Sequence, residues 1–105
     1  MPSRQMVDPL RKQFRFAARR WREATRYLAS PREIAIHESY QTIIDMGPGV
    51  VPFILEDLRD NGGQWYIALR RFVADPPEIS QETARSTENV IATWLEWGRQ
   101  HGYRI

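Results

Sequence analysis

Five basic side chains recur at helical spacing near the start of the chain. Lys12, Arg15, Arg19, Arg22 and Arg26 follow one another at steps of three and four residues. Because an α-helix turns about 100° per residue, this spacing places all five on one face of a helix. Guanidinium groups bind carboxylates and phosphates through paired hydrogen bonds. The row is interpreted either as the solvent-exposed back of a core helix, or as a surface that binds the carboxylates of an acidic protein partner, the phosphates of a nucleic acid or the acidic part of the chain itself.

The balance of charge along the chain bears on the choice between these partners. Of the 15 cations in 105 residues, all but Lys12 are arginine. Residues up to Arg32 carry nine cations and two acids, a net charge of +7, whereas the rest carries six cations and eleven acids, a net charge of −5. The acidic part of the chain after Arg32 would repel a nucleic acid, so such a partner could bind only on the side of the basic N-terminal part. The sequence also has no helix-turn-helix signature. We therefore favour a protein partner and keep a nucleic acid as the alternative.

Catalysis needs a nucleophile, an acid and a base, or a metal cluster, and the sequence offers few candidates. It contains no cysteine, and its two histidines, His37 and His101, do not form the i, i+4 pair of a zinc site. His37 suits a helix boundary, and His101 suits the last turn of a helix, where its charge complements the helix dipole. We therefore expect no enzymatic activity, no cofactor and no metal.

Two other groups of side chains were weighed as sites. Glu56, Asp57 and Asp60 form an acidic cluster, which we interpret as a solvated helix face because a metal would need further oxygen ligands.

Near the C-terminal end, Trp94 fits the core. Trp97 lies about 300° further round the same helix, at the edge of its apolar face, and we expect it to contact a partner.

An amphipathic helix from about residue 8 to residue 29 is expected to carry the cationic row. Its apolar positions, which recur at steps of three and four opposite the cations, are Leu10, Phe14, Ala17, Trp21, Ala24 and Leu28. The run from Ser30 to Glu33 has the layout of a capping box, so a second helix is expected from Ser30 to about Gly47, with a possible break near His37. Its inward residues are Ile36, Tyr40, Ile43 and Ile44.

Three further helices are expected over about 48–60, over about 64–74 and from between 80 and 87 to the glycines at 98–102. Their inward residues are Val51, Ile54, Leu55, Leu58, Trp65, Ala68, Leu69, Phe72, Val90, Ile91, Trp94 and Leu95. The fold class is therefore all-α: a compact bundle of about five short helices in a single domain, residues 1–105. No apolar run reaches the length of a membrane span, so we expect a cytoplasmic protein without a membrane partner. The sequence leaves self-association open.

A local resemblance supports this helical interpretation. The segment from Tyr40 to Arg59, continued from Trp65 to Phe72, resembles the helix, Gly/Pro turn, helix pattern of HEAT-like repeats. No second copy follows at a period of about 30 to 50 residues, and a solenoid needs about three repeats. The resemblance therefore implies a HEAT-like helical hairpin with right-handed packing of short helices. The lack of a second copy excludes a repeat array.

A second resemblance extends over nearly the whole chain. The residues that carry it are Trp21, Thr25, Leu28, Ser30, His37, Tyr40, Gln41, Ile43, Ile44, Met46, Gly47, Pro52, Trp65, Ala68, Leu69, Asp75, Pro76, the run Trp94 to Gly98, Gly102 and Tyr103. In this pattern the chain resembles a family of short bacterial proteins without an assigned activity, although Glu38 stands where the family commonly has proline. Because the family's members are similar in size to antitoxins, immunity proteins and adaptors, the resemblance implies a small protein-binding module.

Overall fold

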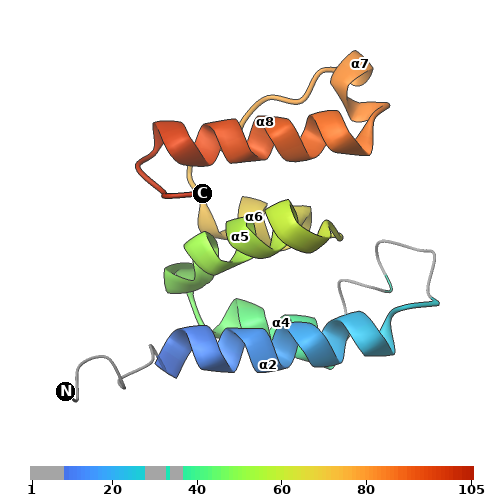
Figure 1. Cartoon of the computed structure of the whole chain (residues 1–105), viewed down its shortest axis with the longest axis vertical. Coiled ribbons are helices and arrows are strands. Elements are labelled where there is room, and N and C mark those ends of the chain that lie inside the picture. Colours follow the sequence, from blue (N-terminus) through green and yellow to red (C-terminus); the bar gives the residue numbers. More distant parts are fainter. Residues whose placement is uncertain (1–8, 28–32, 34–36) are drawn as a thin grey trace. The chain divides into compact units, whose positions relative to one another are not determined.

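The fold is all-α, as the sequence predicts. The computed structural model describes residues 9–27, 33 and 37–105, and within these ranges the regular elements are helices, with no strand (Figure 1). The chain divides into two compact units, Met1–Val50 and Val51–Ile105. The expectation of a single domain stays a prediction.

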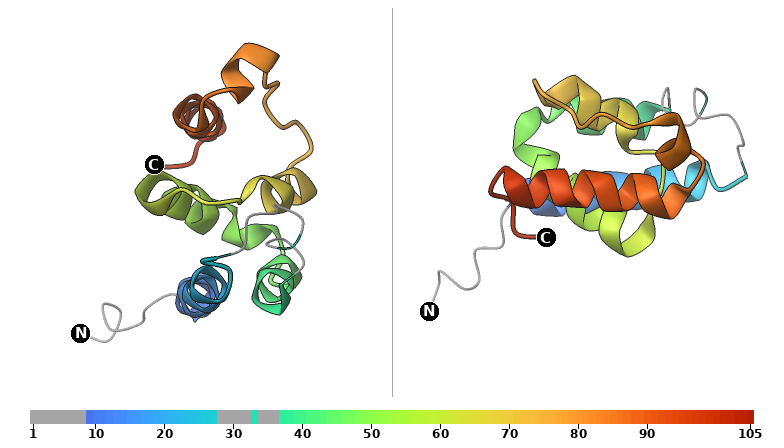
Figure 2. Two further views of the ribbon diagram at one scale, coloured as in Figure 1. Left: turned by 90° about the vertical axis from the view of Figure 1, so that its right-hand side faces the viewer. Right: turned by 90° about the horizontal axis from the view of Figure 1, so that it is seen from above.

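The first unit is built on a pair of helices that pack side by side. Helix α2 (Pro9–Ala24) lies against α4 (Glu38–Asp45), and the 3-10 helix η1 (Pro48–Val50) also contacts α2 (Figures 1 and 2). Phe14, Ala17 and Trp21 are buried, as their spacing predicts. The Trp21 ring centroid lies 5.2 Å from that of Tyr40, at an interplanar angle of 54°. This tilted pair of aromatic rings joins the buried faces of the two helices.

Helix α2 ends earlier than the sequence suggests. We expected it to reach Ala29, but it stops at Ala24, which is exposed, and residues 25–27 form a turn. At this point the hydroxyl of Thr25 donates to the Trp21 carbonyl at 2.6 Å, and the Thr25 amide donates to the same carbonyl at 3.0 Å. A threonine hydroxyl that bonds the carbonyl one turn back competes with the regular helical ladder. Leu28, and with it the last predicted turn, lies outside the described residues.

The start of α4 identifies the role of His37. The helix begins at Glu38, and the Nδ1 atom of His37 accepts a hydrogen bond from the Ser39 amide at 3.1 Å. His37 is therefore a helix cap, which confirms its predicted place at a helix boundary. The capping box at Ser30 lies outside the described residues apart from Glu33. Tyr40 and Ile43 are buried as predicted, Ile44 is half-buried and Ile36 is not described.

The second unit contains four helices in the described part of the chain. They are α5 (Val51–Asn61), α6 (Tyr66–Phe72), α7 (Gln81–Ala84) and α8 (Thr87–Gln100). Helix α5 packs against α6 and α8, and α7 packs on α8 (Figure 2). The start of the last helix was left open between residues 80 and 87; the structure places α7 there and begins α8 at Thr87. The α-helix expected from residue 48 begins at Val51, after η1.

The predicted inward rows form the core of this unit. The fully buried side chains include Val51, Ile54, Leu55, Leu58, Trp65, Ala68, Leu69 and Trp94. Phe72, Val90 and Ile91 are only half-buried. Gly98, which we took as a signal for the helix end, instead lies buried inside α8. A Cβ atom at Gly98 would come within 2.7 Å of Ile105 Cδ1 and 2.9 Å of Leu55 Cδ1, so a larger residue here would require the ends of these two side chains to shift.

No helix among the described residues is long and apolar enough to cross a membrane.

Leu69 tests the predicted core of the second unit. Its side chain is fully buried, whereas Ile67, two residues earlier on α6, is exposed. Leu69→Ala should lower the free energy of unfolding by about 2–5 kcal/mol, because the substitution removes buried methyl groups and leaves a cavity. The matched control Ile67→Ala should change it far less. Urea unfolding followed by circular dichroism measures both, and equal losses would show that Leu69 is not a core residue.

Candidate partner-binding surface

The outward face of α2 exposes three of the five cations predicted to bind a partner. Lys12, Arg15 and Arg19 are exposed, on the side of the helix away from Phe14 and Trp21. The sequence fixes this arrangement because residues three and four apart share a helix face, so burying the apolar row turns the cations outward. Lys12, Arg15 and Arg19 form no ion pair with any described residue.

The other two predicted residues differ from these three. Arg22 is only half-buried rather than exposed, and it takes part in a contact within the chain. Arg26 is exposed but lies in the turn after Ala24, off the helix, because α2 ends early. The structure therefore exposes Lys12, Arg15 and Arg19 on one helix face, with Arg22 less exposed one turn further along α2 and Arg26 beyond the end of the helix.

Phe16 is part of the same outward face, and sequence reasoning missed it. Its side chain is 65% exposed. Lys12, Arg19 and Arg20 lie three or four residues away, so they are its neighbours on the helix surface. The Arg20 guanidinium carbon lies 5.7 Å from the centre of the Phe16 ring, a cation–π arrangement. The available signal was that Phe16 lies two residues from Phe14, which places it about 200° round the helix from the buried row.

We call Lys12, Arg15, Phe16, Arg19 and Arg20 the α2 face. It combines a large exposed aromatic ring with four cations on one helix. Such a surface can accept carboxylates or phosphates at the cations while an apolar group packs on the ring. Tyr27, in the turn after α2, is a second exposed aromatic residue at 90% exposure.

Trp97 does not lie at an exposed edge as the sequence suggests. It is only 7% exposed, and its indole Nε1 donates to the carbonyl oxygen of Asp75 at 2.7 Å. Its ring stacks on His101 at a centroid distance of 4.1 Å. Trp97 has the angular position on α8 that its spacing from Trp94 predicts. The segment that follows α6 and the C-terminal residues, however, cover its indole ring. Asp75 is 22 residues away in the chain, so its contact with Trp97 could not be predicted from the spacing of residues along α8.

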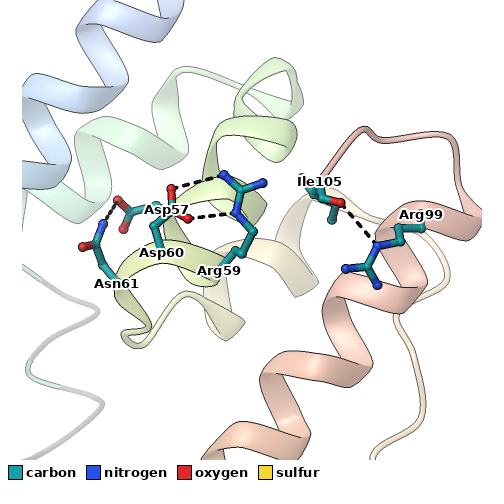
Figure 3. A network of polar contacts seen from close by, with 6 residues as sticks. All are labelled: Asp57, Arg59, Asp60, Asn61, Arg99 and Ile105. Atoms are coloured by element: carbon teal, nitrogen blue, oxygen red, sulfur yellow. Dashed lines mark hydrogen bonds and ion pairs between the residues drawn. The ribbon is translucent and has the colours of Figure 1, made fainter.

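In the acidic cluster on α5, Asp57 is a structural acceptor, whereas Asp60 forms an exposed ion pair. Asp57 Oδ2 accepts from the indole Nε1 of Trp65 at 2.9 Å, and its Oδ1 accepts from the side-chain amide of Asn61 at 2.9 Å. Asp60 pairs with Arg59 at 2.8 and 3.2 Å, and Figure 3 shows this pair together with the bond between Asp57 and Asn61. Hydrogen bonding by the Arg59 guanidinium lowers the pKa of Asp60. Asp57 is half-buried, so the expectation of a purely solvated face is wrong for that residue.

Metal chemistry gains no support from this cluster. Within residues 9–27, 33 and 37–105, no three His, Cys, Asp or Glu side chains are grouped so that they could hold an ion. The carboxylates of Asp57 and Asp60 are directed to donors of the chain itself.

Comparisons of the chain with models of known protein families, with curated proteins and with solved structures find no match. The resemblance to short bacterial helical proteins and the resemblance to HEAT-like repeats therefore both stay predictions.

Asp57 and Asp60 allow a matched test of the acidic cluster. Asp57→Ala should lower the free energy of unfolding by about 1–3 kcal/mol, because it removes the acceptor of the buried Trp65 indole. Asp60→Ala removes an equal charge from the same helix but only an exposed ion pair, so it should leave stability nearly unchanged. Chemical unfolding of both variants measures the difference, and equal stabilities would contradict the structural role of Asp57.

Proposed function

We propose that the protein is a small binding module that holds an acidic protein partner through the α2 face, in the manner of an antitoxin, immunity protein or adaptor. The observation that carries this proposal is the exposure of Phe16 among four cations on a helix whose opposite face is buried. Burial of Phe14 and Trp21 fixes the orientation of the helix, so the α2 face is presented on a rigid element.

The composition of the α2 face favours a protein partner. Protein interfaces are enriched in aromatic residues and arginine, with an apolar centre and a polar rim. Phe16 would supply the apolar contact, and Lys12, Arg15 and Arg19 would pair with carboxylates around it. Positive charges of this kind also speed the approach of an acidic partner over distances of about one Debye length, roughly 8 Å at physiological salt.

The partner-binding residues in this proposal differ in part from those predicted from the sequence. Lys12, Arg15 and Arg19 keep the role of partner contacts, and exposed Arg26 and Tyr27 would extend the surface beyond the end of α2. Arg22 is less accessible. Trp97 is buried, so in this proposal the exposed aromatic contact is made by Phe16 instead.

A nucleic acid is the second candidate, and Phe16 is the observation that favours it. Exposed aromatic rings beside cations stack on unpaired bases while the cations neutralise phosphates. This mode predicts binding to single strands in preference to duplexes, together with a steep loss of affinity as salt rises.

Charge reversal on the α2 face tests the proposal. The triple variant Lys12→Glu, Arg15→Glu, Arg19→Glu should remain folded, because all three side chains are exposed. It should no longer retain the acidic protein that copurifies with the wild type from native cells. The matched control is Arg71→Glu, Arg85→Glu, Arg104→Glu, which changes the net charge by the same amount through exposed residues of the second unit and should retain the partner.

The same variants separate the two candidate partners. With a protein partner, fluorescence anisotropy near physiological salt should detect negligible binding of the wild type to single-stranded or duplex DNA or RNA. Submicromolar binding that is lost in the α2 variant and kept in the control would instead establish the nucleic acid as the partner. If the α2 variant keeps every partner of the wild type, the α2 face is an ordinary solvated surface and the proposal is wrong.

A further inference from the structure

The imidazole of His101 is held between two hydrogen-bond acceptors at the C-terminal end of α8. Its Nε2 atom lies 2.8 Å from Oδ2 of Asp75, and its Nδ1 atom lies 2.8 Å from the carbonyl oxygen of Trp97. A carbonyl oxygen accepts only, and so does an ionised carboxylate. Both nitrogens must therefore donate for both bonds to form.

Only the imidazolium form of His101 satisfies this geometry. Neutral imidazole carries one N–H, so either tautomer would leave a ring-nitrogen lone pair facing an oxygen lone pair at 2.8 Å. In agreement, the hydrogen bond with Asp75 raises the pKa of His101 above its ordinary value of 6.5, and the bond with the Trp97 carbonyl raises it further. The charged form is thus favoured at higher pH than in an ordinary histidine.

Asp75 is held to α8 at two points. Its side chain bonds His101, and its backbone carbonyl accepts from the Trp97 indole at 2.7 Å. The Trp97 ring lies near-parallel to the ring of His101, at 22°, and to the ring of Tyr103, at 24°. We call Asp75, Trp97 and His101 the clasp, since these residues attach the segment after α6 to the end of α8.

The clasp adjoins an apolar hollow in the second unit. Pro77, two residues after Asp75, lines a hollow of about 440 Å³ together with Trp97, Ala92, Thr93, Glu96 and Gln100. One wall of this hollow therefore belongs to the segment that the clasp holds, and the opposite wall belongs to α8. Movement of Asp75 away from α8 would change both the shape of the hollow and the cover of the Trp97 indole.

We propose that the clasp is a proton-controlled switch: with His101 charged it is closed over Trp97, and with His101 neutral it loosens, exposes the indole and changes the shape of the hollow beside it. Asp75 supplies the charge that faces the imidazole from the segment after α6. On α8 itself, Glu96 and Arg99 pair with each other at 3.3 Å, and Arg99 also donates to the Ile105 carbonyl (Figure 3). Arg104 is exposed in the C-terminal segment.

The sign of the pH effect follows from the raised pKa of His101. Because the folded protein holds this proton more tightly than the unfolded chain, the clasp contributes its full stability below about pH 6.5. That contribution is lost as pH rises through the pKa of His101 in the folded protein. The switch does not depend on the proposed role of the α2 face, and its test uses a different readout.

Nuclear magnetic resonance can follow both parts of the clasp in the intact chain. The ring signals of His101 report its protonation, and the indole Nε1–H signal of Trp97, assigned with Trp97→Phe, reports its bond to Asp75. As pH rises, the Trp97 indole signal should shift with the same midpoint as His101, and hydrogen exchange at that indole should quicken. Asp75→Asn should lower the midpoint of both signals, because it removes the carboxylate that holds the proton. His37→Asn, which alters the other histidine but keeps a capping residue at that position, should leave both midpoints unchanged.

His101→Gln gives an independent measurement. Glutamine cannot acquire a charge, so the Trp97 indole signal should lose its pH-dependent shift between about pH 5 and 8. The difference in unfolding free energy between wild type and His101→Gln should shrink as pH rises over the same range. A Trp97 signal that stays constant while His101 titrates would overturn the proposal. A His101 midpoint that is unchanged in Asp75→Asn would overturn it as well.

Discussion

Burial of the four tryptophans is the interaction on which the arrangement of these helices depends. The described α-helices run from four to sixteen residues, and isolated helices of such lengths are marginal in water. Trp21, Trp65, Trp94 and Trp97 are all buried, and each removes a large apolar surface from water at a contact between elements. Without these contacts, neither the α2 face nor the clasp would be held in place.

A buried indole N–H group usually finds an acceptor, and this preference accounts for the place of the Asp57 carboxylate. Trp65 donates to the Asp57 carboxylate and Trp97 donates to the Asp75 carbonyl, whereas Trp94 Nε1 has no hydrogen-bond partner among the described residues. The Arg70 guanidinium lies 5.9 Å from the centre of the Trp94 ring. The acidic side chains of the second unit are thus partly committed to internal contacts, whereas Lys12, Arg15 and Arg19 of the first unit point to solvent.

The two units carry features that respond to different conditions. In its proposed role the α2 face acts through charge on an exposed helix, so its attraction for a partner would weaken as salt screens it. In the proposed switch the clasp acts through two short hydrogen bonds to one imidazole, so its state would depend on a proton. The two proposals thus place a partner-binding surface on one unit and a pH-sensitive contact on the other.

The sequence by itself determined what depends on residues within one or two helical turns of each other. Helical periodicity placed Phe14, Trp21 and Leu69 in the core and turned Lys12, Arg15 and Arg19 outward, and His37 was identified as a helix boundary residue. The same periodicity placed Phe16 off the buried row, although its exposure was recognised only in the structure. Each of these features depends on the fixed geometry of the α-helix.

Only the tertiary structure decided which side chains meet across elements. The cover over Trp97 and the acceptors around His101 join residues 22 and 26 positions apart, and the close packing of Gly98 involves Leu55 from another helix. Asp57 likewise became a structural acceptor because α6 brings Trp65 to it. Such contacts depend on how helices pack, and no spacing along one helix specifies which residue of another will lie opposite. For that reason the outward cations could be predicted from the sequence, whereas the clasp could not.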